Sequence, residues 1–171
     1  FKSGLNEQIK TYASELNQVV KHIANLNVEI SVSESRKEQQ ANDLRDRRDL
    51  LLSNLSKIID IDYFEDERGM LSVRGPGTVL LVDGNHSNDF TLEAGDNGLY
   101  QVHVKNSSGE FSQNITEKMS SGELKAVIDV RDNLLSDLIE RNDQLAYKFS
   151  KSFNDVHRQG FGLGEFANIN Q

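Results

Sequence analysis

The chain has no cysteine, no tryptophan and a single proline among its 171 residues. Without cysteine, the sequence excludes disulfides, cysteine-ligated zinc and a thiol nucleophile. Lysine and arginine number 19 against 27 aspartate and glutamate, and the resulting net charge of −8 argues against binding nucleic acid, which requires a basic face. No run approaches 18 consecutive apolar residues, so no membrane span is expected. Neither a nucleic acid nor a membrane is predicted as a partner.

Scarce proline and 27% charged residues favour long, solvated helices. Between positions 6 and 31 the apolar residues follow gaps of three and four, which predicts a helix over 6–33 with a coiled-coil-like stripe. Polar residues between them predict a solvated opposite face. Positions 33–40 contain no apolar residue, and a loop or a frayed helix end is expected there. The predicted packing stripe consists of Ile9, Leu16, Ile23, Leu26 and Ile30.

Two further helices are predicted, over 42–59 and 120–158. Asn42 is the expected N-cap of the first, and Ser120 and Glu123 have the spacing of a capping box for the second. The third helix would be about 55 Å long, which the first two could cover end to end. All stripes would then be buried within the chain, so the isolated chain is expected to be a monomer. The stripes of these two helices consist of Leu44, Leu51, Leu55, Ile58, Leu124, Ile128, Leu135, Leu138, Leu145, Phe149 and Val156.

Short apolar runs separated by glycine-bearing turns predict antiparallel strands between 61 and 117. The expected fold class is therefore α+β: an elongated helical bundle with a small antiparallel β-module inserted between helices. Segments 1–60 and 118–160 would together form one helical domain, and 61–117 the inserted module. Segment 161–171 is expected to be the start of a following segment, which is truncated here.

The sequence echo, an internal similarity between two short segments, is the next feature. Residues 48–55 and 131–138 are identical at six of eight positions. One interpretation is that two amphipathic helices converge on similar heptads. The other is that the two helices are structurally equivalent partners. Arg48 and Arg131 would then each place a polar group at an apolar packing position, where it fixes the register of the helices.

No pattern of residues points to catalysis, a bound metal or a cofactor. Segment 83–89 alternates oxygen ligands like the start of a calcium loop, but alanine stands where the bidentate glutamate belongs, so a hairpin turn is predicted. The glycine-rich segment 160–164 opens no helix and does not suit a phosphate. The four histidines lie on different predicted elements, without metal-site spacing: His22, His86, His103 and His157.

Residues 41–58 read ANDLRDRRDLLLSNLSKI and resemble a motif of the FlgK-type hook–filament junction family. Two further stretches resemble that family in the same order along the chain. The first comprises 122–124 with 130–132, and the second comprises 145–146 with 153–164, ending in H-R-Q-G-F-G-L-G. Gly162 departs from the aspartate that the family usually has there. The β-module matches only in position and rough length.

This resemblance implies a structural component of the bacterial flagellum that acts by protein–protein packing and not as an enzyme. It implies an extracellular location, export by the flagellar type III apparatus without a cleaved signal peptide, and self-assembly of the full-length protein. The implied partners are the hook protein and the second junction protein. Two alternatives stay open from the residues: a flagellin-like filament subunit, and a generic coiled-coil adaptor domain.

Overall fold

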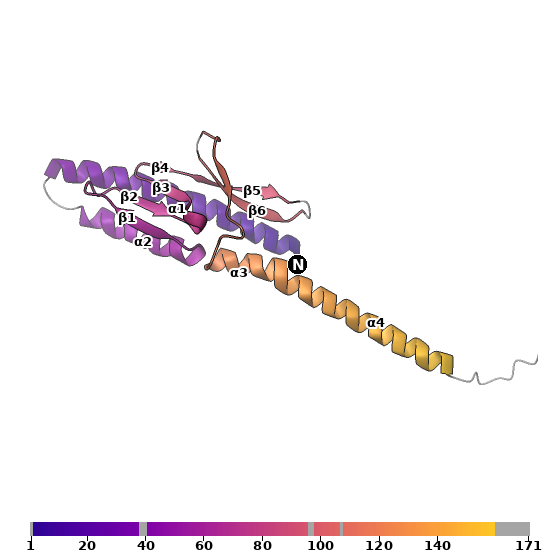
Figure 1. Cartoon of the computed structure of the whole chain (residues 1–171). Helices are drawn as coiled ribbons and strands as arrows, with labels where there is room; N and C mark the ends of the chain where they lie inside the picture. The colour runs from indigo at the N-terminus through magenta and orange to yellow at the C-terminus, as the bar shows by residue number, and fades with distance from the viewer. Residues whose placement is uncertain (1, 38–40, 96–97, 107, 160–171) are drawn as a thin grey trace, which may run out of the picture. The chain divides into compact units, whose positions relative to one another are not determined.

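The computed structural model describes residues 2–37, 41–95, 98–106 and 108–159. They form two compact units. The first, Phe1–Arg131, contains helices α1 (Lys2–Lys37), α2 (Asn42–Ile58) and α3 (Glu123–Asp129), together with seven strands (Figure 1). The second, Asp132–Gln171, contains helix α4 (Leu135–Gln159). A π-helical turn, Val130–Leu134, lies between α3 and α4. The domain division stated from the sequence stays a prediction.

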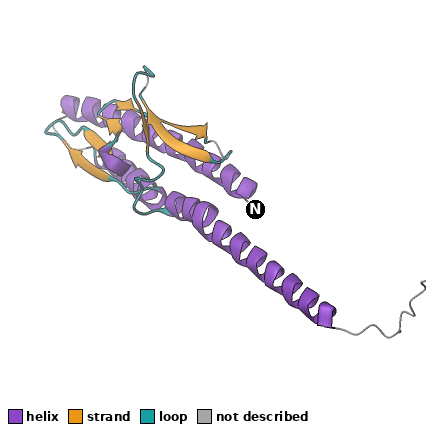
Figure 2. Cartoon of the chain, turned by 45° about the vertical axis from the view of Figure 1, so that its right-hand side comes forward, coloured by secondary structure: helices purple, strands orange, loops and turns teal. Residues whose placement is uncertain are grey.

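The predicted fold class, α+β, is confirmed. An antiparallel β insert lies between helices α2 and α3 in the sequence. The insert forms two sheets, and both lie along α1 (Figure 2). One has the strand order β1-β2-β3-β4 and the other β5-β6-β7, and neighbouring strands are antiparallel in both. The strands are β1 (Asp62–Glu65), β2 (Leu71–Arg74), β3 (Leu80–Asp83), β4 (His86–Ser87), β5 (Asp89–Ala94), β6 (Tyr100–Lys105) and β7 (Ser112–Asn114).

A single apolar core joins α1, α2, α3 and both sheets. Helix α1 contributes one wall, with Ile9, Leu16 and Ile23 fully buried. Strand residues Val73 and Val104 are also fully buried, one from each sheet. The buried strand residues and the buried helix residues belong to one cluster. The β insert is therefore stabilised by burial against the helices.

Three details of the helix ends differ from the predictions. Helix α1 continues to Lys37 through a stretch without apolar residues, because Glu34 there is held by Arg45 of α2. Asn42 is not the N-cap of α2: the helix begins at Asn42, and the carbonyl of Ala41 accepts the amides of Leu44 and Arg45.

The predicted third helix begins at Glu123 and not at Ser120, and the π-helical turn interrupts it. Ser120 forms no capping box, because its amide and hydroxyl both donate to the carboxylate of Asp60, 3.1 Å away in each case. Gly122 takes the N-cap position with φ of +102°. The turn before the helix is thus fixed by contacts with the end of α2.

Gly122 is required at this turn by space as well as by backbone conformation. A Cβ atom added there would lie 2.4 Å from the carbonyl oxygen of Ile58 and 2.9 Å from the amide nitrogen of Ile59. Both neighbours are backbone atoms of the buried end of α2, which cannot move away as a flexible side chain could. Glycine at this position therefore allows α3 to start close against α2.

We expect Gly122→Ala to lower the free energy of unfolding by about 3 kcal/mol or more, because it combines backbone strain with a backbone clash. Gly109→Ala is the matched control. Gly109 also has a positive φ, +74°, but an added Cβ there meets nothing within 4 Å. The control should lose only about 1 kcal/mol. Urea unfolding followed by circular dichroism measures both, and equal losses would contradict the clash.

Candidate functional site

A row of three asparagines on α1 binds the backbone of the β insert. Asn6, Asn17 and Asn27 are 11 and 10 residues apart, close to three helical turns each time. Buried Ala13 and Ala24 lie between them at heptad gaps, so this row forms a second stripe beside the predicted apolar one. The small alanines let the sheets approach the helix while the amides reach the strands.

The middle asparagine pairs with one strand residue as a neighbouring strand would. The amide of Phe90 in β5 donates to Oδ1 of Asn17 over 2.7 Å, and Nδ2 of Asn17 donates to the carbonyl of Phe90 over 2.9 Å. A side-chain amide carries one acceptor and one donor group with the same chemistry as a peptide. Asn17 therefore satisfies both backbone groups of Phe90 on its free side.

Asn27 pairs in the same way with the backbone of Leu71, at the end of the paired stretch of β2 and β3. It is fully buried, and its Nδ2 donates to the carbonyls of Leu71 and Gly84 at 2.8 and 2.7 Å. Its Oδ1 accepts from the amide of Leu71 at 3.3 Å and from Arg48 at 2.9 Å. Asn27 thus fills its hydrogen-bonding capacity inside the core, which is what makes its burial tolerable.

Asn6 binds the start of β6. Its Oδ1 accepts from the amide of Tyr100 at 3.2 Å, and its Nδ2 donates to the carbonyl of Gly98, also at 3.2 Å. The carbonyl of Tyr100 accepts from Nη1 of Arg131 at 2.8 Å, and the same nitrogen donates to Oδ1 of Asn6 at 3.0 Å. Arg131 and Asn6 together cover the side of β6 where β7 does not reach.

The two arginines of the sequence echo have matching surroundings. Arg48 and Arg131 are 1% and 2% exposed, the two largest fully buried side chains of the described chain. Each donates to one asparagine of the row and to one backbone carbonyl, which for Arg48 is that of Gly69 at 2.8 Å. This correspondence supports the interpretation that the two helical segments are equivalent partners of α1.

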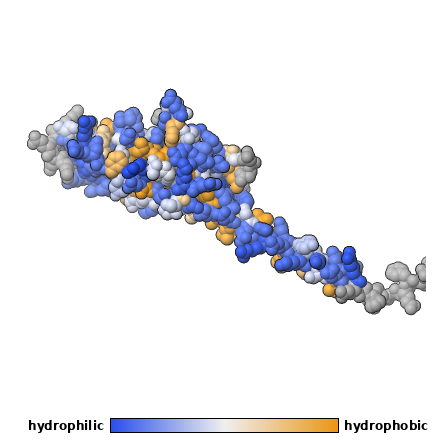
Figure 3. Space-filling view, in the orientation of Figure 1, coloured by the Kyte–Doolittle hydropathy of each residue, from blue (hydrophilic) through white to orange (hydrophobic). Residues whose placement is uncertain are grey.

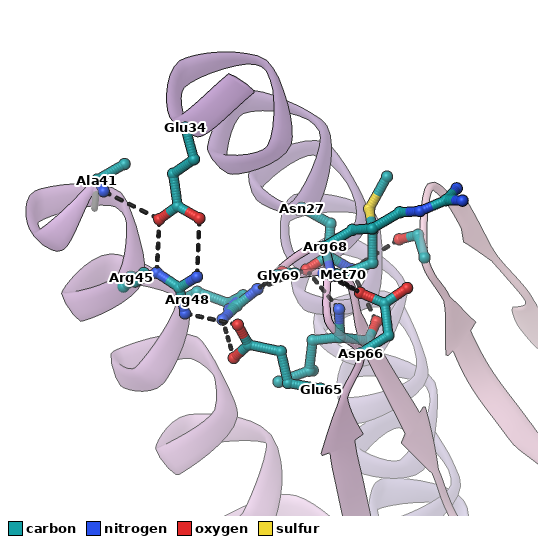
Figure 4. A network of polar contacts seen from close by, with 12 residues as sticks. Asn27, Glu34, Ala41, Arg45, Arg48, Glu65, Asp66, Arg68, Gly69 and Met70 are labelled. Carbon is teal, nitrogen blue, oxygen red and sulfur yellow. Dashed lines mark hydrogen bonds and ion pairs between the residues drawn. The ribbon is translucent and has the colours of Figure 1, made fainter. Parts of the chain in front are cut away.

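Arg48 also belongs to a charged network at the α1–α2 turn (Figure 4). Its Nη2 lies 2.8 Å from Glu65 of β1. Arg45 binds both oxygens of Glu34 at 2.7 and 2.9 Å, and its Nη1 lies 2.6 Å from Glu65. Arg45 thus links two glutamates, one on α1 and the other on β1.

The network shifts the pKa values of two of its members, Glu34 and Arg45. The hydrogen bonds from Arg45, with a further one from the amide of Ala41, lower the pKa of Glu34 to about 2. The same bonds to Glu34 and Glu65 raise the pKa of Arg45 further. Glu34 is thus ionised at neutral pH, and the contacts of this network join α1, α2 and β1.

The predicted packing residues fall into three groups by exposure. Eight are buried: Ile9, Leu16, Ile23, Ile30, Leu55, Ile58, Leu124 and Ile128. Four are partly exposed: Leu26, Leu44, Leu51 and Leu135. Four on α4 are exposed: Leu138, Leu145, Phe149 and Val156. Neighbouring positions take over part of the packing, because Asn27 and Leu52 are buried beside the partly exposed Leu26 and Leu51.

Helix α4 therefore presents an apolar face to solvent. Leu138, Leu145, Phe149 and Val156 are between 51% and 71% exposed, and Figure 3 shows hydrophobic patches between hydrophilic side chains along this helix. The expectation of a monomer rested on every stripe being buried within the chain. That premise is wrong for this face, so the oligomeric state of the chain stays a prediction without that support.

Segment 83–89 contains the β3–β4 hairpin that was predicted in place of a calcium loop. Among the described residues, no cluster of three or more histidine, aspartate or glutamate side chains could hold a metal ion. No helix in that part of the chain is both long and apolar enough to cross a membrane. The glycine-rich segment 160–164 lies outside the described residues.

We expect Asn27→Ala to lower the free energy of unfolding by about 3 kcal/mol, because it leaves the buried amide and carbonyl of Leu71 and the partly buried carbonyl of Gly84 without this partner and removes one of the two acceptors of Arg48 Nη1. Asn25→Ala, on the exposed side of the same helix, is the matched control and should change stability by less than about 0.5 kcal/mol. Thermal and urea unfolding measure both, and a loss below 1 kcal/mol for Asn27→Ala would contradict the proposed importance of the row.

The low pKa of Glu34 makes its contribution dependent on pH. Because the folded-state pKa, about 2, lies below the ordinary value of 4.5, the contribution is complete above about pH 5 and is lost as the pH falls toward 2. Glu34→Gln should therefore lower stability by about 1 kcal/mol at pH 7, and this difference from the wild type should vanish near pH 2. Glu29→Gln, on the exposed surface of α1, is the control. A difference that does not change with pH would contradict the ion pair.

The comparisons with known proteins agree on one family. The model of the flagellar hook-associated protein FlgK helical domain matches residues 1–170. The flagellar hook-associated protein 1 of Salmonella typhimurium is 27% identical over 162 residues, which are 92% of this chain and 29% of that protein. The protein of the same name from Bacillus subtilis is 26% identical, over 93% of this chain and 36% of its own length.

A solved structure shares the fold. The flagellar hook junction protein FlgK from Burkholderia pseudomallei superposes with a TM-score of 0.68 over 76% of this chain and 24% of its own, at 24% sequence identity. The chain spans about a third of the length of the relatives that it matches. Because the family model covers nearly all of it, the chain belongs to the family of FlgK helical domains, which are parts of structural, non-enzymatic proteins of the extracellular bacterial flagellum.

Proposed function

We propose that this chain is the helical domain of a protein that joins the flagellar hook to the filament. The match of the FlgK helical-domain model to residues 1–170 is the observation that carries the proposal. The domain acts by packing and not by chemistry. Its buried polar groups are used to attach the β insert to the helices, which suits a rigid structural part.

The proposed partners are the hook protein on one side and the second junction protein on the other, with further copies of the same chain in the assembled junction. The proposed route to the flagellum is export through the flagellar type III apparatus without a cleaved signal peptide. An apolar face on α4 and a charged surface elsewhere support a domain that is buried partly among other protein segments.

We also propose that Arg48 and Arg131 set the register of the helices on α1. Each is bonded to a single asparagine of the row, Asn27 and Asn6 respectively, at 2.9 and 3.0 Å. A slide of α2 or α3 along α1 by one turn would leave a guanidinium group buried without these partners. Such a shifted packing is strongly disfavoured.

Deletion of the gene in its own bacterium tests the proposed function. We expect cells that build hooks without attached filaments and that release filament protein into the medium. A plasmid copy of the full-length gene should restore attached filaments and motility. Electron microscopy of the hooks and immunoblotting of the medium give the two readouts. Filaments that stay attached to hooks in the deletion strain would contradict a role in the junction.

A further inference from the structure

Strand β1 lies at the edge of its sheet and is exposed along its whole length. It comes first in the strand order β1-β2-β3-β4, and all four of its residues are exposed, whereas its neighbour β2 is buried at three of four positions. Two of the four are aromatic, with Tyr63 54% and Phe64 50% exposed. An edge strand with large exposed apolar side chains is a template for pairing with a further strand.

The pairing with β2 determines which backbone groups of β1 face away from the sheet. Just beyond the strand, the amide of Asp66 donates to the carbonyl of Met70 over 2.9 Å. Along an antiparallel pair, residues that exchange hydrogen bonds alternate with residues that do not. Phe64 therefore bonds with β2, while Tyr63 and Glu65 direct their amides and carbonyls toward the free edge.

The register on β2 agrees with this assignment. Leu71 lies opposite Glu65, and both its amide and its carbonyl bind Asn27 on the side away from β1. On the edge strand β5, the corresponding groups of Phe90 are satisfied by Asn17. No side chain in the described part of the chain takes that role for β1. Its outward amides and carbonyls are thus available to a partner.

The side chains along this edge are held in place by contacts within the chain. The guanidinium group of Arg74 lies 5.2 Å from the centre of the Phe64 ring, and it also pairs with Asp62 at 3.1 Å. Glu65 is bound by two arginines of α2 (Figure 4). A partner would therefore meet an edge whose side chains are already ordered, which lowers the entropic cost of binding.

The chain around this edge is strongly acidic. Five of the eight residues 60–67 are aspartate or glutamate, and none is lysine or arginine. Asp60 accepts from the amide and hydroxyl of Ser120, and Asp66 accepts from two backbone amides, so the donors on both are neutral. Six residues of extended chain span about 20 Å. A strand with a basic residue at each end would meet one of these carboxylates at each end.

The same charges disfavour pairing of β1 with β1 of a second copy. In the antiparallel registers that bring the outward groups of Tyr63 and Glu65 together between copies, two carboxylates always lie directly opposite each other. Like charges in that position are destabilising. The opposed pairs are Asp60 with Asp66, Asp62 with Asp66, or Glu65 with Glu65.

We propose that the free edge of β1 binds an extended segment of a partner protein that carries a basic residue at each end of a short apolar stretch. The segment adds a fifth strand to the sheet, and its backbone bonds with Tyr63 and Glu65. Its apolar side chains cover the two exposed aromatic rings. Its basic side chains lie beside Asp60 and Asp66.

NMR titration of the whole chain with a synthetic peptide tests this proposal. The probe is a seven-residue peptide, acetylated and amidated, with lysine at both ends and alternating valine and threonine between them. In the free chain, the amides of Tyr63 and Glu65 should exchange with solvent faster than that of Phe64, which is bonded to β2. We expect the peptide to slow the exchange of Tyr63 and Glu65 and to leave Phe64 unchanged.

Two controls separate strand pairing from attraction between charges. A peptide of the same sequence with its five central amides N-methylated keeps both lysines but loses its donors, and it should bind about tenfold more weakly. Tyr63→Pro and Tyr63→Val are the matched variants, because proline removes the outward amide hydrogen without removing a bond to β2, and valine keeps it. Tyr63→Pro should bind the unmodified peptide about tenfold more weakly than Tyr63→Val.

Three outcomes would overturn the proposal. One is the absence of peptide binding, and another is equal affinity for the two peptides, which would mean attraction between charges alone. The third is protection of Tyr63 and Glu65 that rises with protein concentration without peptide, because a second copy would then occupy the edge. Circular dichroism checks folding, and the methylated peptide keeps the test decisive if Tyr63→Pro does not fold. The test is independent of the proposed junction function, because it needs no flagellum.

Discussion

The interaction on which the fold depends is the pairing of side-chain amides on α1 with strand backbone. Both antiparallel sheets have buried backbone groups that no neighbouring strand reaches, on the edge strand β5 and beyond the ends of the paired stretches of β2 and β6, and such groups must find other partners. Asn17 and Asn27 supply those partners from inside the domain, at distances of 2.7 to 3.3 Å. A helix lined only with leucine could bury the strands but could not satisfy their peptides.

This pairing explains how Asn27 and two arginines can be buried in an apolar core. Arg48 and Arg131 occupy positions that an apolar side chain would fill in an ordinary helical bundle, and each is bonded to the asparagine row. Removal of one partner would leave the other buried and unpaired, which costs more than the bond itself contributes. The arginines and asparagines therefore act as one unit. They attach each sheet and the helix beside it to the same central helix.

The sequence predicted the helices, the β insert and the family, because these depend on period, turns and motifs that are local. It did not predict the asparagine row. The polar residues of α1 were assigned to a solvated face, yet Asn6, Asn17 and Asn27 repeat with buried alanines at heptad gaps, and that spacing was the available signal. The residues that would contact the apolar face of α4 could not be predicted in the same way. The stripe shows that Leu145 and Phe149 are suited to packing, but not which segment packs on them.

Amide hydrogen exchange measured by NMR tests the central claim most directly. If the asparagine row pairs with the backbone groups that no neighbouring strand reaches, the amides of Leu71, Phe90 and Tyr100 should exchange as slowly as those of the buried core, through global unfolding only. In an Asn17→Ala variant, the amide of Phe90 should become much faster to exchange while Leu71 stays protected. Fast exchange at all three amides in the wild type, with α1 still protected, would contradict the account.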